Sequence, residues 1–165
     1  MHSYDFATQR KIGLDGEKIL DSWLGKTYQI SDVSSIPHYQ KAGIDRVLSI
    51  GKHTINVEYK LDLRARQTQN LFFEHISQDQ GMVPGWGWSS QADYWIFLIP
   101  DQRILVIEPG VMRCIVWQNK GNLDEKCVKN QTYNTLGYPL PISRVESAAK
   151  LVVKLPCDSL PPPNF

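Results

Sequence analysis

The sequence lacks the long apolar runs and the strong net charge that would place it in a membrane or in a general nucleic-acid-binding class. No apolar stretch approaches the ~20 residues that a membrane-spanning helix needs. The first residues also lack the basic and apolar regions of a signal peptide. The formal net charge is +1 over 165 residues. Any contact with nucleic acid must therefore depend on a local cluster of basic side chains.

Cysteine and histidine are sparse as well. The three cysteines, Cys114, Cys127 and Cys157, are odd in number and have no metal-ligand spacing. We expect three free thiols in a protein of the reducing cytoplasm. The four histidines are scattered and no pair has helical ligand spacing, which argues against a zinc site.

Hydrophobic periodicity predicts one α/β domain over residues 1–159, followed by a proline-rich tail at 160–165 that is either frayed or packed. A helix is expected over 8–24, where Gly25 follows as a stop. Further helices are expected between Pro109 and Gly121, and from Ser143, with Glu146 completing a capping box. Strands are expected at 26–31, 45–50, 54–60, 70–76, 94–99 and 103–107. This order favours a mixed β-sheet flanked by helices.

Two of these strands carry a group of charged residues. Side chains two apart on a strand share a face, so Glu58 and Lys60 point the same way. The segment 51–53 is expected to form the hairpin loop between the strands. If the hairpin folds about the midpoint between Lys52 and His53, Asp45 lies opposite Lys60 and diagonal to Glu58. Two carboxylates and one ammonium then converge on one face.

This grouping suits metal-assisted cleavage of a phosphodiester. Asp45 and Glu58 supply the oxygen ligands that Mg²⁺ or Mn²⁺ prefers, and the metal shares its shell with water and phosphate. Lys60 orients the attacking water or neutralises charge on the phosphate. Glu-x-Lys is a short pattern that arises readily by chance. The alternative is a solvated hairpin face with ordinary salt bridges.

The same residues resemble the PD-(D/E)XK nuclease superfamily, which has the restriction-endonuclease-like fold. The likeness rests on Gly43-Ile44-Asp45 followed by Val57-Glu58-Tyr59-Lys60. Ile44 stands where the superfamily motif has proline, and the Glu-x-Lys half matches fully. The resemblance implies a restriction-endonuclease-like mixed sheet, a divalent metal and a DNA substrate.

The likeness extends from about Gly13 to Pro109. Within the first helix, Glu17 matches the acidic residue of Holliday junction resolvases, which implies a catalytic role for it. The segments 70–74, 85–86 and 92–94 resemble small nuclease-like proteins of phages and mobile elements. The resemblance thus implies a metal-dependent endonuclease for branched or mobile-element DNA.

Further candidate residues surround the motif. Glu74 shares strand parity with Phe72 and Ile76, so it is either a supporting group of the metal site or an exposed strand end. Arg64 and Arg66 form the best local basic patch for contacts with nucleic-acid phosphates, and a solvated loop is the alternative. Asp62 joins Glu58 and Lys60 only if the strand continues that far.

The Trp86 and Trp88 loop offers base stacking, a dimer contact or core packing, and we favour packing. Catalysis on double strands suggests a homodimer by analogy. The competing functions are a DNA-binding or regulatory protein without catalysis on the same fold, and an interaction protein that uses the tryptophan loop. The same metal cluster serves branched, single-stranded, nicked and sequence-specific duplex DNA, so the motif does not select among these substrates.

Overall fold

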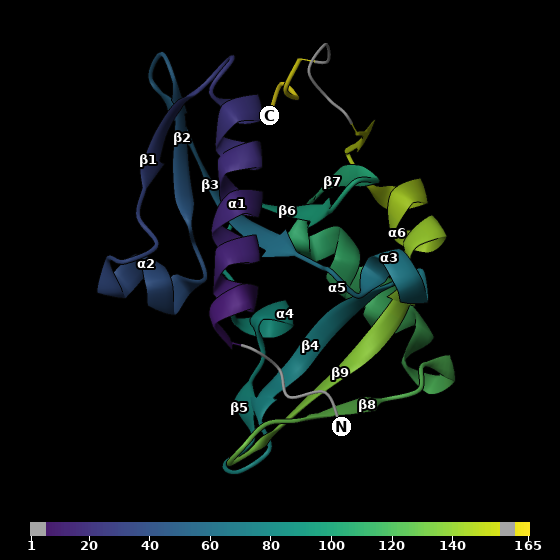
Figure 1. Ribbon diagram of the computed structural model, residues 1–165. Helices are drawn as coiled ribbons and strands as arrows, with labels where there is room; N and C mark the ends of the chain where they lie inside the picture. Colours follow the sequence, from purple (N-terminus) through teal and green to yellow (C-terminus); the bar gives the residue numbers. More distant parts are fainter. Residues whose placement is uncertain (1–5, 156–160) are drawn as a thin grey trace.

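The computed structural model contains two β-sheets with helices around them, and it describes residues 6–155 and 161–165 (Figure 1). In the first helix, side chains are described from Asp15 onward. No helix in these described ranges combines the length and the apolar character that crossing a membrane requires.

The larger sheet has six strands in the order β1-β2-β3-β6-β7-β10. Only β3 and β6 are parallel, and every other neighbouring pair is antiparallel. The sheet is therefore mixed, as predicted. Its strands are β1 (Gln29–Asp32), β2 (Arg46–Ile50), β3 (His53–Leu61), β6 (Tyr94–Ile99), β7 (Arg103–Ile107) and β10 (Leu151–Lys154).

A second, antiparallel sheet has four strands in the order β5-β4-β9-β8. The strand expected at 70–76 belongs to this sheet and not to the larger one. Figure 1 shows β4, β9 and β8 extending away from the larger sheet. The strands are β4 (Asn70–Gln78), β5 (Val83–Pro84), β8 (Lys126–Lys129) and β9 (Asn134–Pro141).

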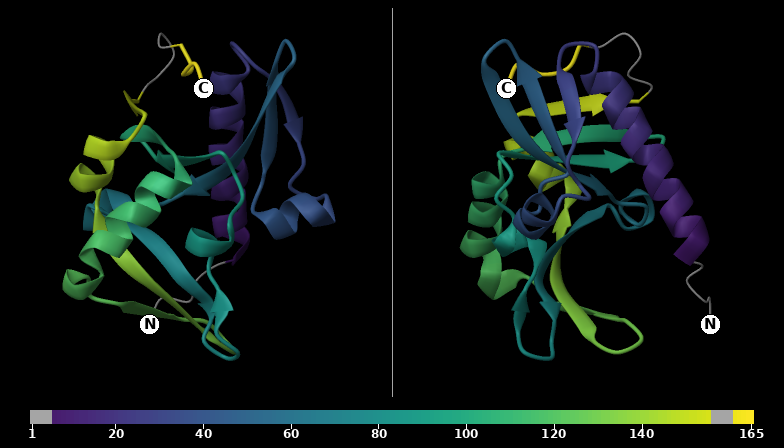
Figure 2. Two further views of the ribbon diagram at one scale, coloured as in Figure 1. Left: turned by 180° about the vertical axis from the view of Figure 1, so that it is seen from behind. Right: turned by 90° about the vertical axis from the view of Figure 1, so that its left-hand side faces the viewer.

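Helices cover both faces of the larger sheet, because β6 and β7 are apolar on both sides and need partners on each. Figure 2 shows α1 along one face and α5 on the other side of the sheet. The helices are α1 (Phe6–Leu24), α2 (Pro37–Ala42), α3 (Ala65–Thr68), α4 (Trp86–Ser89), α5 (Pro109–Asn119) and α6 (Ile142–Ala148), with a 3₁₀ turn η1 at Lys120–Asn122.

The two faces have separate apolar cores. On the α1 face, Leu20, Trp23 and Leu24 pack against Val57 and Ile96 of the sheet. On the opposite face, Phe73 of the second sheet packs with Trp95 and Phe97, together with residues of α5 and α6. Alternate residues of β3 therefore point into different environments, which decides where the charged residues of this strand lie.

The hairpin between β2 and β3 is tighter than predicted. Ile50 pairs with His53, so the turn is Gly51-Lys52 and His53 already belongs to β3. Gly51 has a φ of 59°, a conformation that L-residues rarely adopt and glycine adopts at little cost. The predicted register, with Asp45 opposite Lys60, is wrong, because Arg46 pairs with Val57.

Other boundaries also differ from the prediction. The strand expected from Lys26 begins at Gln29, because Thr27 and Tyr28 donate backbone hydrogen bonds to Leu24 in the turn that ends α1. The capping box of the last helix is absent. Pro141 is the N-cap of α6 and makes no side-chain bond there.

The described end of the chain, residues 161–165, packs against the protein. Tyr28 donates its hydroxyl hydrogen to the carbonyl oxygen of Pro163 over 2.6 Å. The ring of Phe165 lies 4.7 Å from that of Tyr94 and 5.5 Å from that of Tyr28, between ring centroids. Of the two alternatives for the tail, these residues show packing.

Candidate functional site

Asp45 and Glu58 lie next to each other where β2 begins. Asp45 is the residue before β2, and its backbone N–H donates to the carbonyl of Val57 over 2.9 Å, next to Glu58 on β3. Strand alternation gives Glu58 and Lys60 the same face of β3, and the charges of both act on the Asp45 carboxylate. The structure therefore brings together the three residues of the predicted metal site.

Glu58 is buried, with 6% of its surface exposed. Lys60 Nζ donates a hydrogen bond to Glu58 Oε1 and pairs with its charge. Glu58 Oε2 is buried and finds no hydrogen-bond partner among the residues that the structure describes. An unsatisfied buried acceptor costs about 1–3 kcal/mol, and more when it is charged. The oxygen is thus available to a cation at little further cost.

Asp45 is half-buried beside this carboxylate. One of its oxygens, Oδ2, accepts a hydrogen bond from the backbone N–H of Tyr59 over 2.7 Å. Burial raises the pKa of Asp45 and the charge of Glu58 raises it further, whereas the bond from Tyr59 and the charge of Lys60 oppose the rise. Two neighbouring carboxylates that repel each other in this way gain from a shared divalent cation.

Trp86 of α4 holds Lys60 from the other side. Lys60 Nζ lies 4.3 Å from the centroid of the Trp86 ring, a cation–π geometry. Trp86 also donates its backbone N–H to Glu74 Oε1 over 3.3 Å. Burial raises the pKa of Glu74, and the charge of Lys60 opposes this rise. Glu74 therefore lies close enough to Lys60 for their charges to interact, as a supporting residue of the site would.

The glycines next to Trp86 explain how α4 approaches the second sheet so closely. A Cβ atom at Gly85 would lie 2.5 Å from the carbonyl oxygen of Glu74, and one at Gly87 would lie 2.5 Å from the ring of Phe73. No other residue fits there without a shift. The alternation of glycine and tryptophan is thus a packing signal, and Trp86 contacts the rings of Phe73 and Trp95, as the packing prediction expected.

Glu17 lies on the α1 face, with a different set of partners. Its Oε2 accepts a hydrogen bond from Arg46 Nη2 over 2.7 Å. Arg46 is only 3% exposed and also pairs with Asp21 at 3.1 Å and Asp32 at 3.0 Å. The structure does not bring Glu17 into contact with Asp45 or Glu58. Its link to the site runs through Arg46, whose Nη1 donates to the Asp45 carbonyl over 3.1 Å.

Asp32 shows the electrostatic effect of this group. Burial raises its pKa, but hydrogen bonds from the hydroxyl and the backbone N–H of Ser34 and the charge of Arg46 outweigh that rise. The net result is a pKa below the usual value. The interaction with Arg46 thus favours the ionised form of Asp32.

The three charged residues after β3 separate into different roles. Asp62 accepts backbone hydrogen bonds from Arg64 at 3.1 Å and Ala65 at 2.9 Å, so it fixes the start of α3. Arg66 is exposed and pairs with Asp101 at 2.9 Å. Arg64 is exposed and lines a pocket of about 600 Å³ that Lys60 also lines. Of the predicted basic patch, Arg64 is the member that faces the site.

Arg113 of α5 was not predicted from the sequence. It donates to the carbonyl oxygens of Gly87 at 2.7 Å and Ser90 at 2.6 Å, which ties α4 and its C-cap residue to α5. Burial lowers its pKa and the charge of Glu58 opposes this, so the guanidinium lies within electrostatic reach of the site. Its sequence signal, one arginine in a helix, is too common to single it out.

The oxygen donors at the site supply part of the ligand set that a hard divalent cation needs. The described residues contain no group of three or more histidine, cysteine, aspartate and glutamate side chains arranged to hold a metal. Asp45 and Glu58 are two oxygen donors, and Glu58 Oε2 has no hydrogen-bond partner within the described part of the chain. Mg²⁺ is commonly bound by one or two carboxylates, with water and substrate phosphate completing its shell. The residues present therefore match a metal site in which two carboxylates bind the cation and water and a phosphate supply the remaining ligands.

Comparison with known proteins gives no identification, because no protein-family model, curated protein or solved structure matches the chain.

Proposed function

We propose that this protein is a Mg²⁺- or Mn²⁺-dependent DNA endonuclease that hydrolyses phosphodiester bonds. The proposal depends on one observation: Glu58 is buried beside Asp45, with one oxygen on Lys60 and the other without a partner among the described residues. A fully neutralised structural pair would leave no oxygen unsatisfied. The resemblance to the PD-(D/E)XK superfamily, together with a mixed sheet flanked by helices, supports the same reading.

Each residue has a defined task in the reaction. Asp45 and Glu58 would hold the metal, which supplies Lewis-acid activation of the phosphate and of a bound water. Lys60 has three N–H donors, of which one is bonded to Glu58. The remaining donors can contact a phosphate oxygen and stabilise charge as the bond breaks. Trp86 and Glu74 keep the ammonium in place.

The second candidate function is DNA binding without catalysis on the same fold. It is favoured by the bond between Lys60 and Glu58, which already neutralises part of the acidic pair. An interaction role through both tryptophans has less support, since Trp86 packs between Phe73 and Trp95. Trp88 is 41% exposed. The homodimer stays a prediction.

Thermal unfolding in Mn²⁺ and a cleavage assay together test the proposal. A ligand at about 100 times its Kd stabilises the fold by about 2.7 kcal/mol. For a domain of this size, that raises Tm by about 5–10 °C. Glu58→Gln should lose this stabilisation and the cleavage of supercoiled, linear and branched DNA. Glu108→Gln is the matched control, because Glu108 is exposed and its side chain makes no capping bond.

The two candidates give different results. Metal-dependent stabilisation and cleavage that both depend on Glu58 support the nuclease. Salt-dependent DNA binding with no cleavage and no Mn²⁺ effect supports the binding protein and contradicts the nuclease.

A further inference from the structure

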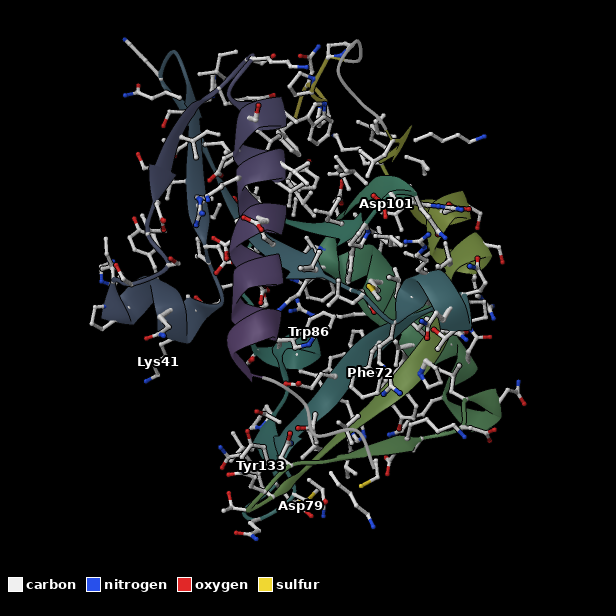
Figure 3. All side chains as sticks on the ribbon, viewed as in Figure 1. Lys41, Phe72, Asp79, Trp86, Asp101 and Tyr133 are labelled. Carbon is white, nitrogen blue, oxygen red and sulfur yellow. The ribbon has the colours of Figure 1, made fainter. Side chains whose placement is uncertain are left out.

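The pocket beside Lys60 has an apolar interior and a positively charged opening. It has a volume of about 600 Å³, and its walls include the rings of Phe72, Trp86 and Phe97. Phe72 lies on β4 of the second sheet, and Figure 3 shows it beside Trp86 in the middle of the molecule. Pockets of about 300–1,000 Å³ with aromatic walls bind ligands of small-molecule size. The volume suits one nucleotide or a little more.

Cationic side chains dominate the charge of this pocket. Arg64, the N-cap residue of α3, and Lys126 of β8 line it, and both are exposed. Lys60 forms part of the same wall. Among the described residues that line the pocket, the one carboxylate is Asp62, whose oxygens accept backbone N–H groups of Arg64, Ala65 and Phe72. The pocket thus offers aromatic side chains to a base and positive charge to a phosphate.

We propose that this pocket binds an unpaired nucleotide of the DNA strand that is cut, so that single-stranded or branched DNA is the preferred substrate. This inference rests on the proposed nuclease function, because Lys60 is shared by the pocket and the metal site. A base in the pocket would place the adjoining phosphate next to Lys60. A base of a duplex must be unpaired and unstacked before it can enter the pocket, and this step costs free energy. A base of a single strand is already unpaired and avoids this cost.

Binding measured in EDTA tests the pocket without any cleavage. The probe is a fluorescein-labelled single-stranded oligonucleotide of about 12 nucleotides, compared with its duplex at one fixed salt concentration. We expect the single strand to bind at least about tenfold more tightly. Equal or tighter binding of the duplex would overturn the inference.

Two matched pairs of variants locate the binding surface. Arg64→Gln should weaken binding of the single strand about tenfold. Arg66→Gln should change it less than about twofold, because Arg66 does not line the pocket and pairs with Asp101. Lys126→Gln and Lys129→Gln form the second pair on β8, with Lys126 in the pocket and Lys129 outside it. Equal effects within each pair would place the strand elsewhere.

Cys127 gives a direct readout of occupancy, because it lines the pocket and is exposed as a free thiol. In a Cys114→Ser/Cys157→Ser background, the oligonucleotide should slow maleimide modification of Cys127 several-fold. In a Cys127→Ser/Cys157→Ser background, it should leave Cys114 on α5 unprotected. Thymidine monophosphate should protect Cys127 far less than the strand does. Equal protection would instead assign the pocket to a free nucleotide.

These results separate the inference from the proposed function. Protection of Cys127 by a single strand that is never cut in Mn²⁺ upholds the pocket and contradicts the nuclease. Cleavage that depends on Glu58, with Cys127 unprotected and duplex preferred, upholds the nuclease and overturns the pocket.

Discussion

The strength of the Lys60 and Glu58 interaction can be measured by a double-mutant cycle. The side chains of Lys60 and Glu58 are 20% and 7% exposed, so the pair is largely buried. Breaking a buried ion pair by removing one member costs 3–5 kcal/mol, since a charge remains buried and unpaired. Lys60 keeps some solvent contact, so we expect Lys60→Met to destabilise the metal-free protein by about 3 kcal/mol. Methionine preserves an apolar contact with the Trp86 ring.

Glu58→Gln is the second member of the cycle. The amide keeps a hydrogen-bond acceptor for Lys60 but removes the charge, so we expect a loss of about 1–2 kcal/mol. The double variant contains neither charge and should be less damaged than the sum of the single variants. The expected coupling free energy is at least about 1.5 kcal/mol.

Urea unfolding in EDTA measures this cycle. With a slope of about 2 kcal/mol/M, a loss of 3 kcal/mol lowers the midpoint by about 1.5 M. Lys52→Met is the control, because Lys52 is exposed in the hairpin turn and should change stability by less than about 0.5 kcal/mol. Single variants whose losses add to the double loss within about 0.3 kcal/mol would refute the buried pair.

Two further predictions concern carboxylates on opposite faces of the sheet. Asp21→Asn should lower the free energy of unfolding by about 1–2 kcal/mol, since Asp21 accepts bonds from Arg46 and is itself one-third exposed. Asp15→Asn on the same helix should cost less than about 0.5 kcal/mol, because its pair with Lys18 is exposed, and equal losses in thermal unfolding would contradict the network. Burial raises the pKa of Glu74, so ionisation of Glu74 removes stability as the pH rises above the ordinary value of 4.5. The urea midpoint of Glu74→Gln, measured in EDTA, should therefore rise relative to that of the wild type as the pH increases from 4 to 7. A difference between the two midpoints that does not change with pH would contradict the raised pKa of Glu74.

Face parity could be predicted from the sequence although register could not. The turn has two residues, Gly51 and Lys52, and the prediction gave it three. Moving the hairpin midpoint by one residue changes the partner of Arg46 from Tyr59 to Val57. It leaves the face unchanged, because partners shift by two and side chains alternate with a period of two. The grouping of the carboxylates was therefore robust to the error.

Burial of the site could not be predicted, because it depends on contacts between segments distant in the chain. The second sheet and α4 cover the face that carries Glu58, and strand patterning alone leaves that face open. Glu74 illustrates the same limit. Strict alternation predicted that Glu74 and Ile76 share a face. The pairing of β4 with β9 shifts between these two residues, so they lie on different faces. Phe73 and Ile76 are buried instead.

The alternation that directs Glu58 to one face also connects the hairpin to α1 on the other. Tyr59 lies between Glu58 and Lys60 in sequence, and its hydroxyl donates to Asp21 over 2.9 Å. Its backbone N–H holds Asp45 Oδ2 on the opposite face. Arg46 repeats the pattern, with its side chain among the carboxylates of α1 and its Nη1 on the Asp45 carbonyl.

Asp45 is thus held by two residues that are anchored to α1, Arg46 and Tyr59, and Tyr59 also adjoins Glu58 and Lys60 in sequence. A carboxylate fixed in this way spends little conformational entropy when it binds a cation, and a functional site benefits from such rigid support. Glu17 fits this arrangement as a positioning residue. Its carboxylate fixes Arg46, and Arg46 fixes the backbone that carries Asp45, so α1 supports the position of Asp45 from the other face of the sheet.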